Sequence, residues 1–243
     1  MTPDVMLAVE ALSAWYGGAR ILYDLAFEVR RGEVVALMGR NGAGKSTTLK
    51  AIMGLIGRRT GTVRFNGRDI SRIESYAIAR LGLGFTPEDR RIFSDLTVLE
   101  NLDVGRQNPR RFADGALAPA WTPQRLFALF PNLGEMPHRP GSRMSGGEQQ
   151  MLTVARTLMG NPLLVLMDEP SEGVAPLVVE QMADAIVELK KEGLSILLCE
   201  QNLHFARLVS DRVYVLEKGQ VRFAGAMAEL AGNAQVQRAF LTV

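Results

Sequence analysis

The sequence has few of the residues that form disulfides and zinc sites. Its single cysteine, Cys199, excludes an internal disulfide, and its two histidines are too few and too far apart to suggest zinc. It also lacks an excess of either charge, because 28 Lys and Arg stand against 26 Asp and Glu. A net charge of +2 gives no reason to expect nucleic acid as a partner. This composition fits a protein of the reducing cytosol.

Long hydrophobic runs are missing as well. The longest, such as residues 163–167, have the length of a strand and fall far short of the roughly 20 residues that cross a bilayer. Residues 1–4 show no basic region followed by an apolar one, so no signal peptide is expected. Any role at a membrane is therefore expected to depend on a partner protein. A hydrophobic content of 47% still predicts a substantial globular core.

A glycine-rich stretch before a helix is the most informative part of the sequence. It has two glycines separated by four residues and followed by Lys and Ser, the phosphate-loop pattern, and consists of Gly39, Arg40, Asn41, Gly42, Ala43, Gly44, Lys45, Ser46 and Thr47. Residues 33–38 are predicted as a buried strand and the residues from Ser46 onward as a helix, as the motif requires. Backbone N–H groups would face the phosphates of a nucleoside triphosphate, Lys45 would reach the terminal ones, and Ser46 would ligate Mg²⁺.

The first part of the chain predicts an antiparallel sheet. Residues 7–16 and 23–29 are β-rich and separated by two glycines, and residues 62–65 lead into Asn66-Gly67, a tight-turn signal. Tyr16 stands at a strand end. The residues alone leave open whether it stacks on an adenine ring or packs on the sheet.

The middle of the chain predicts helices and an insertion. A helix is expected over residues 75–81, followed by a strand that ends at residues 83–85. Thr97 and Glu100 have the spacing of a capping box at a helix start. Residues 107–123, with their prolines and glycine, are predicted to form a surface insertion.

A second capping box, formed by Ser145 and Glu148, opens another predicted helix. Gly146 and Gly147 fall in its first turn, where each glycine costs roughly 1 kcal/mol relative to alanine. Two such residues suggest that another group approaches the backbone closely. A helix start with small residues, free N–H groups and a hydroxyl suits an anion. An ordinary cap is the alternative.

Two carboxylates, Asp168 and Glu169, follow the predicted buried strand 163–167. Ligands bind at the carboxyl ends of strands in open parallel sheets, so both are expected beside the phosphate loop. Asp168 suits Mg²⁺, and Glu169 suits polarising the water that attacks a γ-phosphate.

The rest of the chain predicts strands and helices in alternation, which indicates a parallel sheet. The expected elements are a helix over 178–189, a strand over 196–199, a hairpin over 213–223 and one last helix near 226–241.

The order of these motifs resembles the ATP-binding subunits of ATP-binding-cassette (ABC) transporters over almost the full chain. The match consists of the phosphate loop, a signature at residues 144–150 and the acidic strand end at residues 166–170. The resemblance implies an α/β fold: a P-loop ATPase core with a mixed or parallel sheet, an antiparallel β subdomain and an inserted helical subdomain. It also implies a single ABC domain over residues 1–243, with the core at about 1–84 and 161–243 and the helical subdomain at about 85–160.

In this family, two copies face each other, and the signature of one caps the γ-phosphate held by the other. The resemblance therefore assigns Ser145, Gly146, Gly147 and Glu148 to the ATP of the opposite subunit, which would explain the two glycines. It makes Tyr16 the adenine-stacking aromatic, residues 171–175 the loop that crosses the dimer interface, and ATP and Mg²⁺ the cofactors. The implied partners are a second ABC ATPase subunit in a homo- or heterodimer, membrane permease subunits, and a periplasmic or extracellular substrate-binding protein. The subunit would lie peripherally on the cytoplasmic face of the membrane.

Two positions depart from the family pattern. Glu88 stands where the family usually has a Gln that contacts the metal and the attacking water, and Gln201 stands where it usually has His. Gln201 cannot take a proton at neutral pH, so it would sense the γ-phosphate by hydrogen bonding, or be idle in the weaker half of a mixed dimer. The role is not carried over to His204.

Both departures, together with the motifs at residues 87–93 and 170–173, make the chain resemble the subgroup that serves branched-chain amino-acid importers. Close relatives of that subgroup import urea, short amides or aromatic acids. A soluble ABC protein that remodels a macromolecular complex is a further alternative, although the chain has no long coiled-coil insertion and no cysteine-rich segment. A non-catalytic scaffold is another, and Glu169 argues against it.

Overall fold

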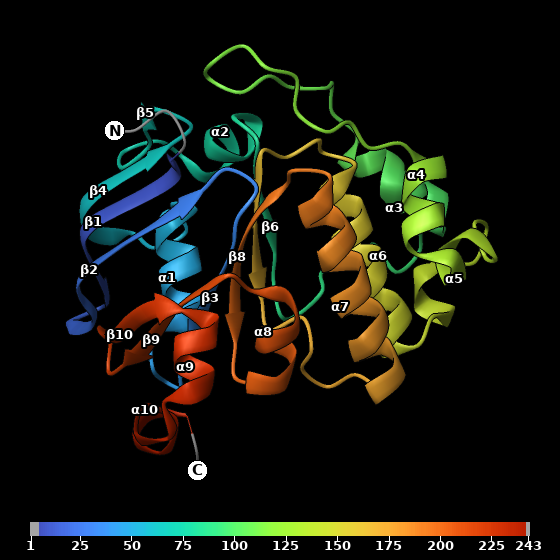
Figure 1. Ribbon diagram of the computed structural model, residues 1–243. Helices are drawn as coiled ribbons and strands as arrows, with labels where there is room; N and C mark the ends of the chain where they lie inside the picture. The colour runs from blue at the N-terminus through green and yellow to red at the C-terminus, as the bar shows by residue number, and fades with distance from the viewer. Residues whose placement is uncertain (1–4, 242–243) are drawn as a thin grey trace.

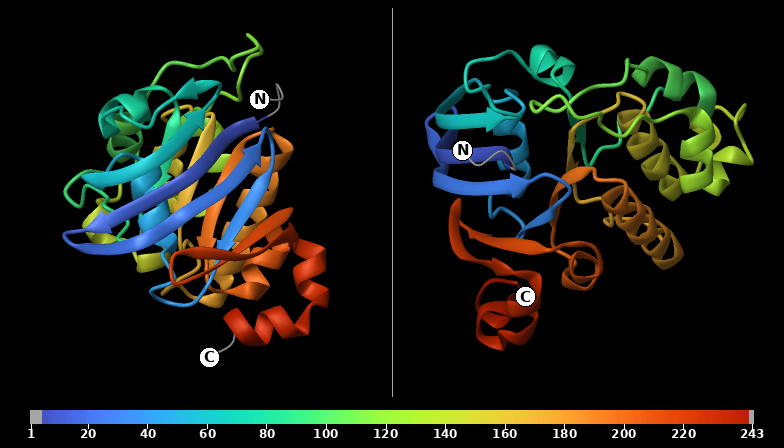
Figure 2. Two further views of the ribbon diagram at one scale, coloured as in Figure 1. Left: turned by 90° about the vertical axis from the view of Figure 1, so that its left-hand side faces the viewer. Right: turned by 45° about the horizontal axis from the view of Figure 1, so that its top comes forward.

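The computed structural model of the protein describes residues 5–241. It contains a four-stranded antiparallel sheet and a six-stranded mixed sheet. The antiparallel sheet lies on one side of the mixed sheet, and a group of helices lies on the other side (Figures 1 and 2). The α/β class with its two sheets is the one that the sequence predicts.

The antiparallel sheet has the strand order β2-β1-β4-β5. Its strands are β1 (Val5–Tyr16), β2 (Ala19–Arg30), β4 (Arg58–Phe65) and β5 (Arg68–Asp69). Val9 of β1 pairs with Phe27 of β2 and Val63 of β4, so the central strand joins both neighbours. Leu25, Phe27 and Val29 alternate with more exposed residues on β2, and the sheet therefore buries one face. The predicted pairing of residues 62–65 with the first strands is confirmed.

The mixed sheet has the order β10-β9-β3-β8-β7-β6, in which only β10 is antiparallel to its neighbour. Its strands are β3 (Val34–Met38), β6 (Leu83–Thr86), β7 (Leu164–Asp168), β8 (Ser195–Glu200), β9 (Arg212–Glu217) and β10 (Gln220–Ala226). Every residue of β3, β7 and β8 is buried, as expected for central strands covered on both faces. Because these strands are parallel, their carboxyl ends lie at the same edge of the sheet.

Helices cover both faces of the mixed sheet. They are α1 (Lys45–Ile52), α2 (Ser75–Arg80), α3 (Val98–Gly105), α4 (Pro123–Leu129), α5 (Pro131–Gly134), α6 (Gly146–Leu158), α7 (Pro176–Lys191), α8 (Leu203–Val209), α9 (Met227–Gly232) and α10 (Ala234–Phe240), with a 3₁₀ turn at Gly141–Arg143. α1 contacts strands of both sheets and so lies between them (Figure 1). No helix within residues 5–241 is long and apolar enough to cross a bilayer.

The core follows from the two-residue period of the central strands. On β7, Leu164 and Leu166 belong to the hydrophobic cluster shared with α1 and the antiparallel sheet. Val165 and Met167 face the cluster formed with α6, α7 and the other helices beyond them. β7 is therefore packed on both faces, and this packing fixes the position of its carboxyl end, where Asp168 lies.

Both predicted capping boxes are present. Thr97 caps α3 with Glu100, and Ser145 caps α6 with Glu148, each by reciprocal bonds between side chain and backbone. The sequence did not predict α4, α5 or α8. The prediction of a single last helix near 226–241 was wrong, because two helices, α9 and α10, meet at Asn233. The Asn233 side chain accepts a hydrogen bond from the backbone of α10 and caps that helix.

The insertion contains no helix between α3 and α4 and, contrary to the prediction, it is not confined to the surface. Phe112, Ala118 and Trp121 are buried. The Arg31 guanidinium lies 3.6 Å from the ring centroid of Phe112 and forms a 2.8 Å ion pair with Asp114. Residues 106–122 therefore run back to the side of the antiparallel sheet, as the loop at the top of Figure 1 shows.

Candidate functional site

The phosphate loop lies between β3 and α1, where only glycine fits at two positions. Gly44 precedes α1 with φ of 107°, a conformation that L side chains rarely adopt. At Gly39, a Cβ would come within 2.5 Å of the Leu216 carbonyl oxygen. The loop is thus held against β9, and α1 directs its N-terminus toward the loop.

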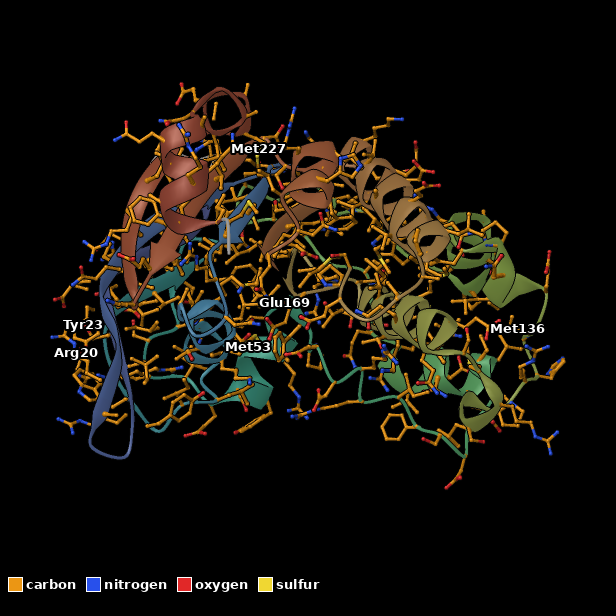
Figure 3. All side chains as sticks on the ribbon, turned by 90° about the horizontal axis from the view of Figure 1, so that it is seen from below. Arg20, Tyr23, Met53, Met136, Glu169 and Met227 are labelled. Carbon is orange, nitrogen blue, oxygen red and sulfur yellow. The ribbon has the colours of Figure 1, made fainter. Side chains whose placement is uncertain are left out.

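Lys45 and Glu169 form a buried ion pair across this loop. Their Nζ and Oε1 atoms lie 3.0 Å apart, and the side chains are 3% and 7% exposed. Lys45 Nζ also donates to the Gly39 carbonyl oxygen at 2.9 Å. Glu169 follows β7 with φ of 48°, and its backbone N–H donates to the Cys199 carbonyl oxygen on β8. The sheet edge therefore places the glutamate over the lysine of the loop, near the middle of the view in Figure 3.

Gln201 approaches the same glutamate from the loop after β8. Its Nε2 atom donates to Glu169 Oε2 at 2.9 Å and to Asn41 Oδ1 at 2.6 Å. Burial opposes the ionisation of Glu169, but bonds from Glu172, Gln201 and Lys45 outweigh it and lower the pKa of Glu169. Glu169 is therefore held as a carboxylate.

Asp168 and Ser46 are a second pair at this edge. Ser46 Oγ donates to Asp168 Oδ1 at 2.8 Å. Burial raises the pKa of Asp168, because desolvation disfavours the charged carboxylate. A cation bound nearby would stabilise that charge. A hydroxyl and a carboxylate in contact at a phosphate loop are a donor set that suits Mg²⁺ together with phosphate oxygens and water. Residues 5–241 contain no cluster of three or more His, Cys, Asp or Glu that could hold a metal without such help.

An open cavity of about 340 Å³ lies in front of these groups. It is lined by Asn41, Gly42, Gly44, Lys45, Ser46, Thr47, Glu88, Glu169 and Glu172. Glu88 is exposed in the loop after β6. In the sheet, β6 and β8 flank β7, so the loops that carry Glu88 and Gln201 follow the strands on either side of β7. The structure thus brings together the loop residues, Glu88, Asp168, Glu169 and Gln201, which the sequence predicts as one site.

Glu172 was not predicted as a site residue. It shares a hydrogen bond with the Glu169 carboxylate, and this bond, with partial burial, raises the pKa of Glu172 to about 7. The sequence carried a signal for it, because residues 169 and 172 have the spacing of the first and last residues of one tight turn. The backbone N–H of Glu172 donates to the Glu169 carbonyl oxygen at 3.1 Å, which closes that turn.

Tyr16 and the signature stand apart from this cavity. Tyr16 is 50% exposed at the end of β1 and is not among the lining residues. Ser145 is exposed at the start of α6, and its hydroxyl accepts the Glu148 N–H at 3.3 Å. Neither is joined to the phosphate loop within one chain.

The two signature glycines have neighbours in their own chain. A Cβ at Gly147 would lie 2.6 Å from Val178 Cγ2 on α7, so this glycine permits close packing of two helix starts. A Cβ at Gly146 would lie 2.8 Å from Nη1 of Arg90, a residue with φ of 60° in the loop after β6. The close approach expected at these glycines therefore has an intramolecular cause at Gly147.

This fold and site define an ATP-binding cassette, and the chain belongs to the ABC transporter family. The family model described as ABC transporter matches residues 22–172, more than half of the chain. Members of this family bind nucleotide and hydrolyse ATP to drive transport. The chain is accordingly an ATPase subunit coupled to transport.

Similar curated proteins match along the whole chain. BraG of Pseudomonas aeruginosa, a high-affinity branched-chain amino acid transport ATP-binding protein, is 40% identical over 97% of this chain and 99% of its own length. LivF of Archaeoglobus fulgidus, named as a probable branched-chain amino acid transport ATP-binding protein, is 33% identical over 96% and 97%. LptB of Haemophilus influenzae, from a lipopolysaccharide export system, is 32% identical over 97% and 97%.

Solved structures show the same fold. A crystal structure of a nucleotide-free ATP-binding cassette from an ABC transporter superposes with a TM-score of 0.79 at 28% identity, covering 96% of this chain and 97% of its own. The ADP conformation of an ATP-binding cassette gives a TM-score of 0.79 at 26% identity, with coverage of 96% and 97%.

Proposed function

We propose that the protein energises a membrane importer of branched-chain amino acids by hydrolysing Mg-ATP at the cavity over the phosphate loop. The observation that carries the ATPase site is the placement of Glu169 between Lys45 and Gln201. The amino-acid substrate is supported by the 40% identity to BraG along nearly the full chain.

Lys45 would change its hydrogen-bond partners when ATP binds. Its Nζ atom bonds Glu169 and the Gly39 carbonyl oxygen in the nucleotide-free arrangement. Phosphates seated on the loop N–H groups would attract Lys45, which releases Glu169 Oε1. That oxygen can then accept a hydrogen bond from the attacking water, while Gln201 keeps the other oxygen oriented. Substrate binding would thus free the general base.

Three residues are proposed to hold the metal. Ser46 would be a direct ligand, Asp168 a ligand directly or through water, and Glu88 a further acidic contact from the loop after β6. When bound, Mg²⁺ supplies positive charge against the β- and γ-phosphates. Lys45 is the protein's own cation among the residues that line the cavity, and the three carboxylates there leave an excess of negative charge for a metal to neutralise.

The active unit is proposed to be a dimer of ABC subunits, with either a second copy or a related chain. Ser145, Gly146, Gly147 and Glu148 lie outside the cavity of their own chain, which supports their assignment to the nucleotide of the opposite subunit. Tyr16 is exposed and available to stack on an adenine ring. ATP would then join the two half-sites, and hydrolysis would separate them.

The permease is proposed to dock at a groove between the sheets and the helical group. This cavity of about 380 Å³ is lined on one side by Leu83 and Phe85 and on the other by Phe93 and Val104. Phe93 is 47% and Val104 53% exposed, so the groove presents apolar surface that a partner protein could cover. The division proposed for this single ABC domain is a core at about 1–84 and 161–243 and a helical subdomain at about 85–160. The subunit would lie on the cytoplasmic face of the membrane.

Reconstitution tests this function. The protein, co-expressed with its permease subunits and a substrate-binding protein in proteoliposomes, should import radiolabelled leucine when Mg-ATP is inside the vesicles. Lys45→Ala should abolish both hydrolysis and import, because it removes the cation that faces the β- and γ-phosphates. Hydrolysis at the normal rate by Lys45→Ala would refute the site assignment. ATP-driven import of urea or amides without leucine would refute the substrate.

A further inference from the structure

Glu200 is a buried carboxylate to which the proposed hydrolysis assigns no role. It is the last residue of β8 and is 1% exposed. Within residues 5–241 no Lys, Arg or His forms an ion pair with it. It does not line the nucleotide cavity either. A buried charge without a cation requires hydrogen bonds to stabilise it.

Three backbone N–H groups from two different loops supply those bonds. Oε1 accepts the Ser171 N–H at 3.0 Å, and Oε2 accepts the Gln201 N–H at 3.1 Å and the Asn202 N–H at 3.2 Å. Each carboxylate oxygen therefore serves one loop. Burial raises the pKa of Glu200, and bonds from the Ser171 hydroxyl and from the Ser171 and Asn202 N–H groups act against that rise.

Both loops carry groups that contact Glu169. Gln201 bonds Glu169 Oε2 through its side chain, and its backbone is fixed by Glu200. Ser171 lies two residues after Glu169, in the turn that also holds Glu172. The Glu200 carboxylate thus bonds the backbone of both loops that contact the proposed general base.

We propose that Glu200 is a positioning residue for hydrolysis, which couples the loop of residues 171–175 to Gln201 and so fixes the orientation of Glu169. The proposal rests on the function proposed above for Glu169. Residues 171–175 belong to the loop assigned to the dimer interface, so Glu200 also transmits a displacement of that loop to the nucleotide site of its own subunit.

The chemistry requires a carboxylate at this position. Glutamine has the same shape, but its amide group donates, so an N–H facing the Ser171 N–H removes that backbone bond and leaves the Ser171 hydroxyl as the partner on this loop. Aspartate keeps two acceptors and is one methylene shorter, so it can bond one loop at full strength and the other only with movement. Glu200→Gln therefore weakens the connection between the two loops while it conserves volume.

The test compares Glu200→Gln in two backgrounds of the reconstituted complex. In the otherwise native protein, kcat should fall on the order of 10- to 100-fold, the effect of misplacing a catalytic group by about 1 Å. The KM for ATP and the affinity for a fluorescent ATP analogue should stay within about twofold. In a Glu169→Gln background, Glu200→Gln should lower the residual rate no further, because it acts through Glu169.

Controls keep the result decisive. Glu33→Gln removes another mostly buried carboxylate, which accepts the Arg30 N–H at the opposite end of β3, and it should leave kcat unchanged. Glu200→Asp should recover part of the rate and serves as the milder variant if Glu200→Gln does not fold. An unchanged kcat, or an equal loss in both backgrounds together with weaker ATP binding, would overturn the positioning role. Normal hydrolysis by Glu169→Gln alone would instead overturn the proposed base.

Discussion

Gln201 Nε2 lies 2.9 Å from Glu169 Oε2, and this bond joins the ends of two neighbouring strands, β8 and β7. Lys45 holds the other carboxylate oxygen at 3.0 Å. Both oxygens of the proposed general base therefore accept bonds before nucleotide binds, and the bonds from Gln201 and Glu172 can persist once Lys45 turns to the phosphates.

The bond makes Gln201 the first target for mutation. Gln201→Ala should lower ATP hydrolysis, because Glu169 loses the donor that orients its Oε2 atom. Gln201→His should retain activity and add a pH dependence between about 6 and 7.5, since imidazole titrates there and an amide does not. Steady-state ATPase rates of the reconstituted complex across pH measure both effects.

His204→Ala provides the matched control, because His204 is exposed three residues further on and should have no effect. Normal turnover in Gln201→Ala would contradict the sensor role. It would place the active switch in the partner subunit of a mixed dimer, where substitution of that subunit's histidine should stop transport.

Glu169→Gln should keep ATP binding and lose most turnover. The amide cannot accept a proton from the attacking water, and general base catalysis is worth about 10²- to 10⁴-fold. Unhydrolysed ATP should then hold two subunits together, so size-exclusion chromatography with Mg-ATP should show a dimer that the unmodified protein forms only transiently. A variant that hydrolyses at the normal rate would require another base, and Glu172 would be the next residue to examine.

Gly146→Asp should fold normally and abolish hydrolysis. The new side chain would meet the Arg90 guanidinium, 2.8 Å from the Cβ position, and a flexible arginine can move to pair with it. ATP binding by the isolated monomer should stay within about twofold, while the carboxylate repels the γ-phosphate of the opposite subunit. Equilibrium binding and ATPase rates separate the two effects, with Gly146→Ala as the uncharged control. Loss of binding by the monomer would contradict this division between subunits.

Glu172 should make the stability of the nucleotide-free protein fall as pH rises toward 7. Its pKa of about 7 lies above the unfolded value of 4.5, so the folded state binds more protons in this window. The stabilisation is complete below the unfolded pKa and is lost as pH passes about 7. Glu172→Gln donates to Glu169 at every pH, so its melting temperature relative to the unmodified protein should increase between pH 5 and 8. Parallel pH profiles of the two proteins would argue against the shared proton.

The sequence was sufficient for features that depend on local chemistry. The phosphate loop needs glycine at fixed positions, and the capping boxes at Thr97 and Ser145 need only residues three apart. Buried strands such as β7 and β8 show as uninterrupted apolar runs, and a parallel sheet then brings their ends together. The proximity of Lys45, Asp168 and Glu169 followed from that geometry.

Contacts between distant segments could not be read from local patterns. The bond between Gln201 and Asn41 joins residues 160 positions apart, and nothing in either neighbourhood specifies it. The break at Asn233 was missed because helical periodicity continues on both sides of a cap residue. The buried positions of Phe112 and Trp121 depend on where the insertion lands, which tertiary packing decides.

The insertion sets a limit on the turning of the helical group relative to the antiparallel sheet. It leaves α3 and reaches Arg31 through the ion pair with Asp114 and the contact with Phe112. The ion pair and the cation–π contact are each worth about 1 kcal/mol or less. Phe112 and Ala118 are also buried in the core of the antiparallel sheet, so opening this anchor would expose apolar surface to water. Any turning of α3 relative to the antiparallel sheet would therefore have to stretch the insertion or break this anchor.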